Sequence, residues 1–205
     1  MQIKKEEVKK RIYDAALSEF KKNGYKGTTI RGISKIANVP IGNLYRYYKN
    51  KGLIFEDIVD EVYTKLMNCI GETDDIGTSL ADMELNIHEC LGKLIDIHTD
   101  YRDELLILFT GSKGSKYENF KQLVINCLSD RIKCECQFYV DKGEALPRDL
   151  FIIDVIATGV IEGFIMISKK YDDTDELECV LKEYAQLNFD DFSSRLKLIT
   201  NNKKK

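Results

Sequence analysis

Tryptophan is absent from the 205 residues, and proline occurs only twice. Apolar and polar residues rarely alternate, so the two-residue period of half-buried strands is missing. Apolar positions instead recur every three or four residues, which is the period of an amphipathic helix. Because 43% of the residues are hydrophobic, the chain has enough apolar surface for one sizeable core and a smaller second one. These features predict an all-α protein with two domains.

The signature motifs of several enzyme classes are also missing. The chain has no G-x-S-x-G elbow, no dinucleotide-binding G-x-G-x-x-G, no phosphate-binding G-x-x-x-x-G-K-[ST] and no H-E-x-x-H. Residues 111–115 are rich in glycine and serine, but no strand precedes them to form a phosphate cradle. The sequence therefore predicts a protein that is not an enzyme and that needs no cofactor.

Six cysteines are present, but the N-terminus shows no signal-peptide pattern, so we expect a cytoplasmic protein with reduced thiols. On a helix, Cys134 and Cys136 point about 200° apart, so the pair would chelate a metal poorly. No C-x-x-C motif is present, and no pair of histidines completes a tetrahedral site. We therefore expect no metal site and cysteines that serve as small buried residues. Cys127 and Cys134 share a helix face, so a thiol- or metal-responsive switch stays open as an alternative.

The most apolar run, residues 150–168 with the sequence LFIIDVIATGVIEGFIMIS, is long enough to be tested as a membrane span. Asp154 and Glu162 lie inside it, and a charged side chain in a bilayer is costly. The run also contains three small residues that would let another helix approach closely: Ala157, Gly159 and Gly163. We therefore predict a helix of a globular domain that takes part in a dimer interface, with no membrane partner.

Charge is distributed unevenly along the chain. Residues 1–52 carry 13 Lys and Arg against 4 Asp and Glu, a net charge of +9, whereas residues 53–205 carry 18 against 30, a net charge of −12. A basic segment on an acidic body attracts polyanions at one end only. We therefore expect one domain over residues 1–52 and a second over residues 53–205.

Residues 28–51, TTIRGISKIANVPIGNLYRYYKNK, predict two short helices joined by a tight turn. Ile33 and Ala37 recur at helical spacing, and a threonine ahead of them can cap the first helix. Asn38 tolerates the left-handed backbone conformation that ends a helix. Pro40 suits the first turn of a second helix, where its missing N–H is not needed.

In that second helix Leu44 and Tyr48 are expected to face inward with Val39, which leaves the other side open. Eight residues offer groups that bind phosphate or base edges, or allow close backbone approach, and are candidate contacts to duplex DNA: Thr28, Thr29, Gly42, Asn43, Tyr45, Arg46, Tyr47 and Lys51. We expect Tyr47 and Lys51 on phosphate and Asn43 on a base. Ile41 cannot form hydrogen bonds, but it can touch a thymine methyl group.

This pattern resembles the tetracycline-repressor (TetR) family of bacterial one-component transcription regulators. The resemblance covers roughly the first quarter of the chain and is carried by Phe20, Gly24, Tyr25, residues 28–30, Ile33, Ala37, Val39, residues 42–48, Lys51 and Leu53. Asn38, Pro40 and Ile41 depart from the family's usual Gly, Ser and polar or basic residue. The resemblance implies a three-helix helix-turn-helix DNA-binding domain, followed by a larger helical domain for ligand binding and dimerisation.

The resemblance also implies a small-molecule pocket between about residues 80 and 140. Its candidate lining residues are apolar, aromatic or soft side chains: Met83, Phe109, Tyr117, Phe120, Cys127 and Phe138. The last two long helices, assigned to residues 150–169 and 176–187, would pair across a two-fold axis. The implied function is that of a homodimeric repressor that leaves its double-stranded operator when a small molecule binds. A thiol- or metal-responsive regulator and a helical enzyme or carrier with an incidental basic end are the alternatives.

Overall fold

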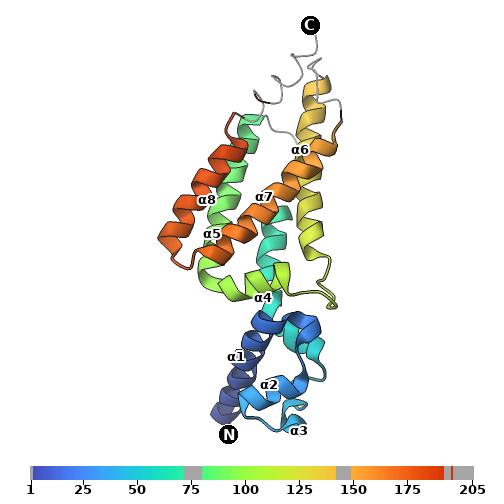
Figure 1. Cartoon of the computed structure of the whole chain (residues 1–205), viewed down its shortest axis with the longest axis vertical. Helices are drawn as coiled ribbons and strands as arrows, with labels where there is room; N and C mark the ends of the chain where they lie inside the picture. The colour runs from blue at the N-terminus through green and yellow to red at the C-terminus, as the bar shows by residue number, and fades with distance from the viewer. Residues whose placement is uncertain (1, 72–79, 142–148, 192–194, 196–205) are drawn as a thin grey trace. The chain divides into compact units, whose positions relative to one another are not determined.

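The computed structural model describes residues 2–71, 80–141, 149–191 and 195, and within these it describes only the backbone of residues 2–4, 80–89, 135 and 137–141. These parts hold eight helices and no strand (Figure 1). The helices are α1 Gln2–Gly27, α2 Ile30–Ala37, α3 Ile41–Leu44, α4 Lys51–Gly71, α5 Leu80–Thr110, α6 Phe120–Asp141, α7 Phe151–Lys170 and α8 Thr174–Phe189. The all-α class predicted from the sequence is confirmed.

The chain divides into two compact units. Unit 1 consists of Met1–Leu66 and Asp100–Lys121, and unit 2 consists of Met67–Thr99 and Gln122–Lys205. The helices α4 and α5 therefore each contribute to both units. Tyr101 has non-helical backbone angles (φ −138°, ψ 35°) inside α5, close to the point where this helix passes from unit 2 into unit 1. Unit 1 thus contains the basic segment 1–52 together with parts of the chain that follow it.

Residues 100–121 are tied to α1 inside unit 1 by polar contacts. The Tyr13 hydroxyl donates to the Glu104 carboxylate at 2.9 Å, and the Lys21 ammonium lies 2.7 Å from the Asp103 carboxylate. The helical part of α1 ends at Gly24, whose φ of 62° favours glycine, and the next backbone N–H donates to the Gly111 carbonyl at 2.7 Å. These contacts join two segments that lie about 90 positions apart in the sequence.

A chain of aromatic rings fills the space between the same elements of unit 1. Neighbouring rings lie with their centroids 4.9 to 6.1 Å apart, a range typical of favourable edge-to-face and offset pairs. The chain is made of Phe20, Tyr25, Phe55, Tyr117, Tyr63, Phe120 and Phe109. Helices α1, α4 and α5 and the start of α6 therefore share one core.

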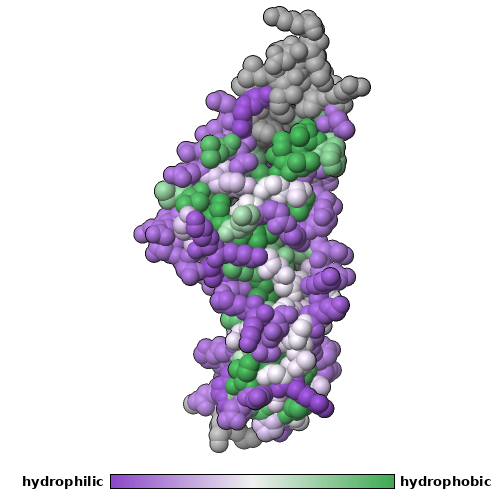
Figure 2. All heavy atoms as spheres, in the orientation of Figure 1, coloured by the Kyte–Doolittle hydropathy of each residue, from purple (hydrophilic) through white to green (hydrophobic). Residues whose placement is uncertain are grey.

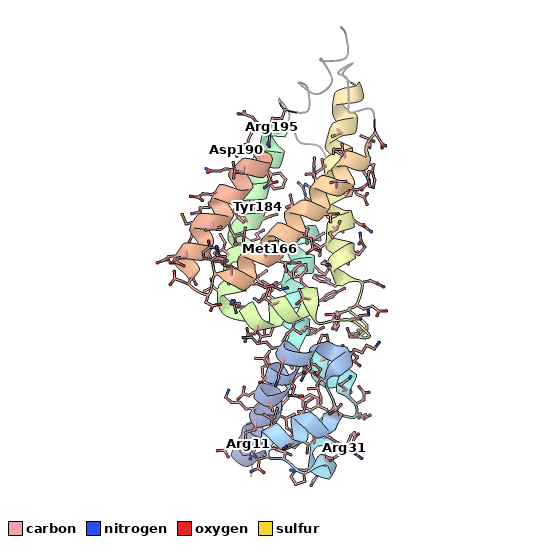
Figure 3. The ribbon with its side chains drawn as sticks, viewed as in Figure 1. Arg11, Arg31, Met166, Tyr184, Asp190 and Arg195 are labelled. Carbon is pink, nitrogen blue, oxygen red and sulfur yellow. The ribbon has the colours of Figure 1, made fainter. Side chains whose placement is uncertain are left out.

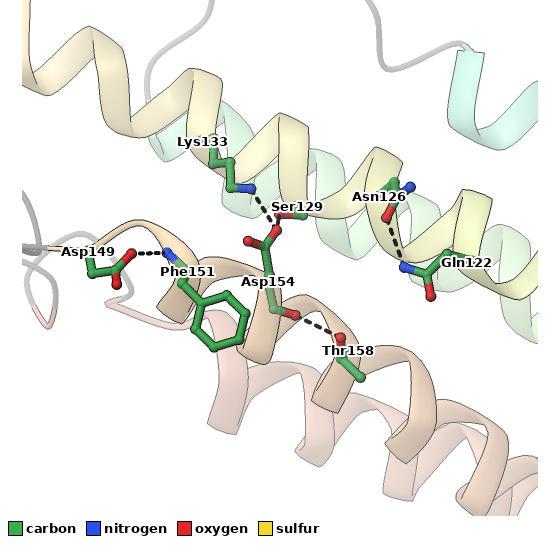
Figure 4. Close-up of polar contacts among 8 residues, drawn as sticks. All are labelled: Gln122, Asn126, Ser129, Lys133, Asp149, Phe151, Asp154 and Thr158. Carbon is green, nitrogen blue, oxygen red and sulfur yellow. Dashed lines mark hydrogen bonds and ion pairs between the residues drawn. The ribbon is translucent and has the colours of Figure 1, made fainter.

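In unit 2, α7 is held to α6 by a polar cluster (Figure 4). The Asp154 carboxylate on α7 accepts from the Ser129 hydroxyl and the Lys133 ammonium of α6, each at 2.6 Å. These two donors lower the pKa of Asp154, so the carboxylate stays ionised. By length and composition, α7 is the one described helix apolar enough to cross a membrane, yet only 28% of its most apolar window is buried. Its acidic residue is used to pack α7 against another helix of the same unit.

The three small residues of α7 differ from one another in their surroundings, so they do not all serve the dimer interface that the sequence suggested. Ala157 is fully buried. At Gly163 an added Cβ would lie 2.1 Å from the Tyr184 hydroxyl oxygen of α8, whereas at Gly159 it would meet no atom within 4 Å. The Tyr184 hydroxyl donates to the Gly159 carbonyl at 2.8 Å. Gly163 thus makes room for α8 of the same chain, and Gly159 alone stays open.

We expect Gly163→Ala to destabilise the protein, because its methyl group would displace the Tyr184 ring. Overpacking of this kind costs about 1–3 kcal/mol, and the higher helix propensity of alanine returns less than about 1 kcal/mol. The thermal unfolding midpoint measured by circular dichroism should therefore fall by a few degrees. Gly92→Ala on α5 is the matched control, since a Cβ there meets no atom within 4 Å. Equal midpoints for the two variants would contradict the packing role of Gly163.

Candidate DNA-binding site

The turn between α2 and α3 forms as its residues predict. Thr29 caps α2, because its side-chain oxygen accepts from the Gly32 N–H at 3.0 Å. The helix ends at Ala37, and Asn38 follows in the left-handed conformation with φ 51° and ψ 47°. The Asn38 N–H donates to the Lys35 carbonyl at 3.3 Å. The predicted cap and the predicted helix end are both confirmed.

Side chains from outside the turn hold it in place. The Arg11 guanidinium of α1 donates to the carbonyls of Ala37 and Asn38, at 2.5 and 2.6 Å. A cation at the last carbonyls of a helix satisfies unpaired acceptors and interacts favourably with the negative end of the helix dipole. The Ser34 hydroxyl also donates to the Val39 carbonyl at 2.6 Å. The orientation of the next helix is thereby coupled to α1.

The helix α3 is shorter than the sequence suggested. It spans only Ile41–Leu44, and Pro40 precedes it as the N-cap instead of lying in its first turn. The Pro40 ψ of 139° is extended, so the helical conformation starts one residue later. The Pro40 carbonyl accepts from the N–H groups of Asn43 and Leu44, at 2.8 and 3.0 Å. A turn follows α3 up to Tyr47 and carries the candidate DNA contacts Tyr45, Arg46 and Tyr47.

The inward side of α3 is anchored as predicted. Val39, Leu44 and Tyr48 are all buried. The Tyr48 hydroxyl donates to the Asp57 carboxylate of α4, and burial together with this carboxylate raises the pKa of Tyr48. The phenol therefore remains a neutral donor at any physiological pH. This bond fixes α3 and its turn against α4.

The outward side of α3 and its turn brings together five of the eight predicted DNA contacts. Gly42, Tyr45 and Arg46 are exposed, and Asn43 and Tyr47 are half-buried. A Cβ at Gly42 would meet no atom within 4 Å, so the backbone there is open to close approach. The sixth, Thr29, is exposed at the start of α2. Five side chains and the open backbone at Gly42 are thus accessible to a duplex.

Thr28 and Lys51 have internal partners, which sequence reasoning missed. Thr28 is buried, with its hydroxyl 2.8 Å from the Gly24 carbonyl oxygen. The Lys51 ammonium donates to the carbonyls of Tyr25 and Thr28, at 2.6 and 2.9 Å, and lies 4.2 Å from the centroid of the Tyr25 ring. Desolvation lowers the pKa of Lys51. Two of its three N–H groups are therefore used inside unit 1.

Two exposed residues of the same region lie outside the eight candidate contacts, and for one of them, Ile41, the sequence left open an apolar contact to thymine. Arg31 extends from α2 two residues after its cap (Figure 3). Ile41 begins α3, and 37% of its side chain is exposed. The position of Arg31 just after a capping threonine is a signal that the sequence already contained. The exposure of Ile41 follows from the packing of α3 and is visible only in the structure.

A family model described as "Bacterial regulatory proteins, tetR family" matches residues 12–58, from α1 to the first part of α4. This segment of the chain is similar to the DNA-binding region of the TetR family. The resemblance seen in the sequence is thereby confirmed. The matched residues include α2, α3 and the Tyr48–Asp57 hydrogen bond that orients them. Arg11 lies one residue before the match.

Relatives in sequence are HTH-type transcriptional regulators. YhgD, an uncharacterised HTH-type transcriptional regulator of Bacillus subtilis, is 33% identical over 96 residues, which cover 46% of this chain and 48% of YhgD. IcaR, the negative transcriptional regulator of a biofilm operon in Staphylococcus epidermidis, is 32% identical over 73 residues, covering 36% of this chain and 40% of IcaR. The chain thus spans about half or less of the length of these TetR-like relatives.

Solved structures extend the likeness to most of the chain. SCO3833, a TetR-family member from Streptomyces coelicolor, matches with a TM-score of 0.64 at 15% identity, covering 87% of this chain and 89% of that one. FadR from Bacillus subtilis, solved in complex with stearoyl-CoA, matches with a TM-score of 0.52 at 18% identity, covering 88% and 97%. These likenesses establish the TetR fold beyond the N-terminal region.

The candidate pocket residues lie in different parts of this chain. Phe109, Tyr117 and Phe120 are buried in the aromatic chain of unit 1. Cys127 is half-buried on α6 in unit 2. The side chains of Met83 and Phe138 lie outside the described residues. The structure brings three of the six together, and a role in ligand binding stays a prediction for all of them.

The cysteines are more exposed than the sequence suggested. Cys136 is buried, but Cys134 and Cys179 are exposed and Cys127 is half-buried. Cys134 and Cys136 point to different sides of α6, as their spacing requires. Among the described residues, no three or more His, Cys, Asp or Glu side chains come together in a way that would hold a metal ion.

Proposed function

We propose that the chain is a homodimeric, DNA-binding transcriptional repressor that leaves its operator when a small molecule binds its C-terminal part. The single observation that carries the proposal is the outward side of α3 and its turn. It presents an amide, a guanidinium and two phenols on a firmly anchored helix-turn-helix, within a segment whose net charge is +9. Such groups bind base edges and phosphates in a major groove.

The exposed side of α7 supports the dimer. Ile152, Val155, Gly159 and Met166 are all exposed and lie three, four and seven residues apart, so they share one face of the helix, as residues of a helix-pairing seam do. Exposed hydrophobic side chains gather near the start of α7 (Figure 2), where Phe151 is 65% exposed. Because contiguous apolar surface of this kind is rarely left in water, we infer that a second copy of the chain covers it. Two reading heads related by a two-fold axis would meet successive major-groove faces about 34–36 Å apart.

Three observations support release by a ligand. The part of the chain after residue 52 is acidic, with a net charge of −12, so as a whole it repels the DNA backbone and is left for another role. The fold accommodates stearoyl-CoA in FadR, and IcaR is a negative regulator. The first part of α4 and residues 100–121 both belong to unit 1, and residues 100–121 contact α1 directly. A ligand that favours one arrangement of the C-terminal helices can therefore change the spacing of the two heads through these segments.

The proposal is tested by the binding of the purified chain to DNA from upstream of its own coding region. The affinity should fall steeply with salt, because bound phosphates release counterions. Asn43→Ala should weaken binding to this DNA by about 5- to 100-fold, since a bidentate amide–base pair discriminates by about 1–3 kcal/mol. Its binding to unrelated duplexes should not change. Fluorescence anisotropy with labelled duplexes measures both affinities.

Asn119→Ala is the matched control, because this exposed asparagine lies in the loop between α5 and α6, outside the helix-turn-helix. It should bind both duplexes like the unaltered chain. If no duplex is bound in a salt-dependent way, the proposed function is wrong. If Asn43→Ala weakens both duplexes equally, Asn43 is not a base contact.

A further inference from the structure

The first turn of the reading helix presents an apolar side chain where a hydrogen-bonding group would be expected. Ile41 is 37% exposed and Tyr45 is 50% exposed. The Tyr45 N–H donates to the Ile41 carbonyl at 3.0 Å, so the two residues stand one helical turn apart and their side chains share one face. Beside Ile41, Gly42 has no side chain and open space around it. Ile41 is therefore an exposed apolar side chain at the start of α3, beside open backbone.

The surroundings of Ile41 decide what covers it. Exposed basic side chains lie on both helices and just after them, namely Arg31, Lys35, Arg46 and Lys49. They belong to the segment whose net charge is +9. A basic rim around an apolar centre is complementary to a polyanion. An apolar protein partner would instead have to bury several unpaired cations, which is costly.

Among the base edges of the major groove, only thymine presents an apolar group, its C5 methyl. The other edges present donors and acceptors, which an isoleucine would desolvate without pairing. Ile41 would thus favour thymine through methyl contact and disfavour cytosine and guanine through lost hydrogen bonds. Both effects point to the same base.

We propose that Ile41 is a specificity-determining residue that reads a thymine methyl group in each half-site of the operator. This proposal rests on the proposed DNA-binding function and deepens it. It assigns to an apolar contact part of the sequence recognition that the polar side chains Asn43 and Arg46 would otherwise supply alone. The operator must then contain at least one thymine per half-site within reach of α3.

The test begins with duplexes selected by the full-length chain from a random-sequence pool. In the best-bound duplex, each thymine is replaced singly by deoxyuridine, which removes only the methyl group and keeps base pairing. At one thymine per half-site we expect binding to weaken about fourfold, the effect of removing one methyl from an apolar contact. Ile41→Ala should bind the thymine and uracil duplexes equally at that position.

Ile36→Ala is the matched control, because Ile36 is an exposed isoleucine on α2, 52% exposed, outside α3. It should keep the full difference between thymine and uracil. The inference is overturned if no thymine position responds to loss of its methyl, or if Ile41→Ala keeps the difference, while salt-dependent binding persists. If no duplex is enriched at all, the proposed function fails and the inference fails with it.

Discussion

Val155→Glu is expected to convert the proposed dimer into monomers and to lower operator affinity by at least about 100-fold. Val155 is 49% exposed in the middle of the exposed α7 seam. In the dimer a carboxylate at this position would be buried without a partner, which costs several kcal/mol. A monomer loses the second half-site, and linked binding of two half-sites typically adds a factor of about 10²–10⁴ to affinity. Analytical ultracentrifugation and anisotropy titrations measure the two effects.

Leu123→Glu provides the control for this result. Leu123 is 39% exposed on α6, so the same type of substitution is placed on another helix of unit 2. This variant should remain dimeric and bind its operator normally. The fold of Val155→Glu should be intact, as judged by its circular dichroism spectrum, since Val155 is not part of the buried core. A dimeric Val155→Glu would show that the subunits associate through another surface.

Lys51→Ala is expected to have two separate effects, one on stability and one on DNA binding. The substitution removes two charged hydrogen bonds and leaves the Tyr25 and Thr28 carbonyls without this donor. Hydrogen bonds to charged groups contribute about 1.5–3 kcal/mol, so we expect a loss of about 2 kcal/mol. For a chain of this size that lowers the unfolding midpoint by about 4–8 °C.

The effect of Lys51→Ala on DNA binding comes from its third N–H, which the internal carbonyls leave available. If this group contacts phosphate as proposed, affinity should fall equally for all duplexes, and the salt slope should drop by about one per subunit. Lys113→Ala, which removes an exposed lysine from the same unit, should leave the midpoint unchanged. An unchanged salt slope in Lys51→Ala would leave this residue with a structural role only.

The helix-turn-helix was predicted almost completely because its signals are local. A cap at Thr29, a left-handed residue at Asn38 and inward positions at Leu44 and Tyr48 depend on backbone angles and helical spacing within about 20 residues. The structure confirms each of them. The length of α3 was overestimated at both ends, since the extended ψ of Pro40 delays its start by one residue and residues 45–47 form a turn.

Roles that depend on distant contacts were not predicted. Lys51 was predicted to be available for phosphate. The residues near it in the sequence do not show that the end of α1, with the Tyr25 carbonyl, lies beside it. Gly163 was predicted to lie in a dimer interface. The sequence does not show that its space is filled by Tyr184, which comes 21 positions later on α8. In both cases the partner is brought close by packing between elements.

The sequence alone therefore determined the all-α class, the family and the location of the reading segment, since these follow from helical periodicity, turn chemistry and the charge contrast between the two parts of the chain. Tertiary structure decided which of the basic and small residues are available to a partner. It showed that residues 100–121 share a core with the reading head and that Ile41 stands exposed on α3. Availability is a property of packing, because a side chain can meet DNA or a second subunit only where its own chain leaves it uncovered.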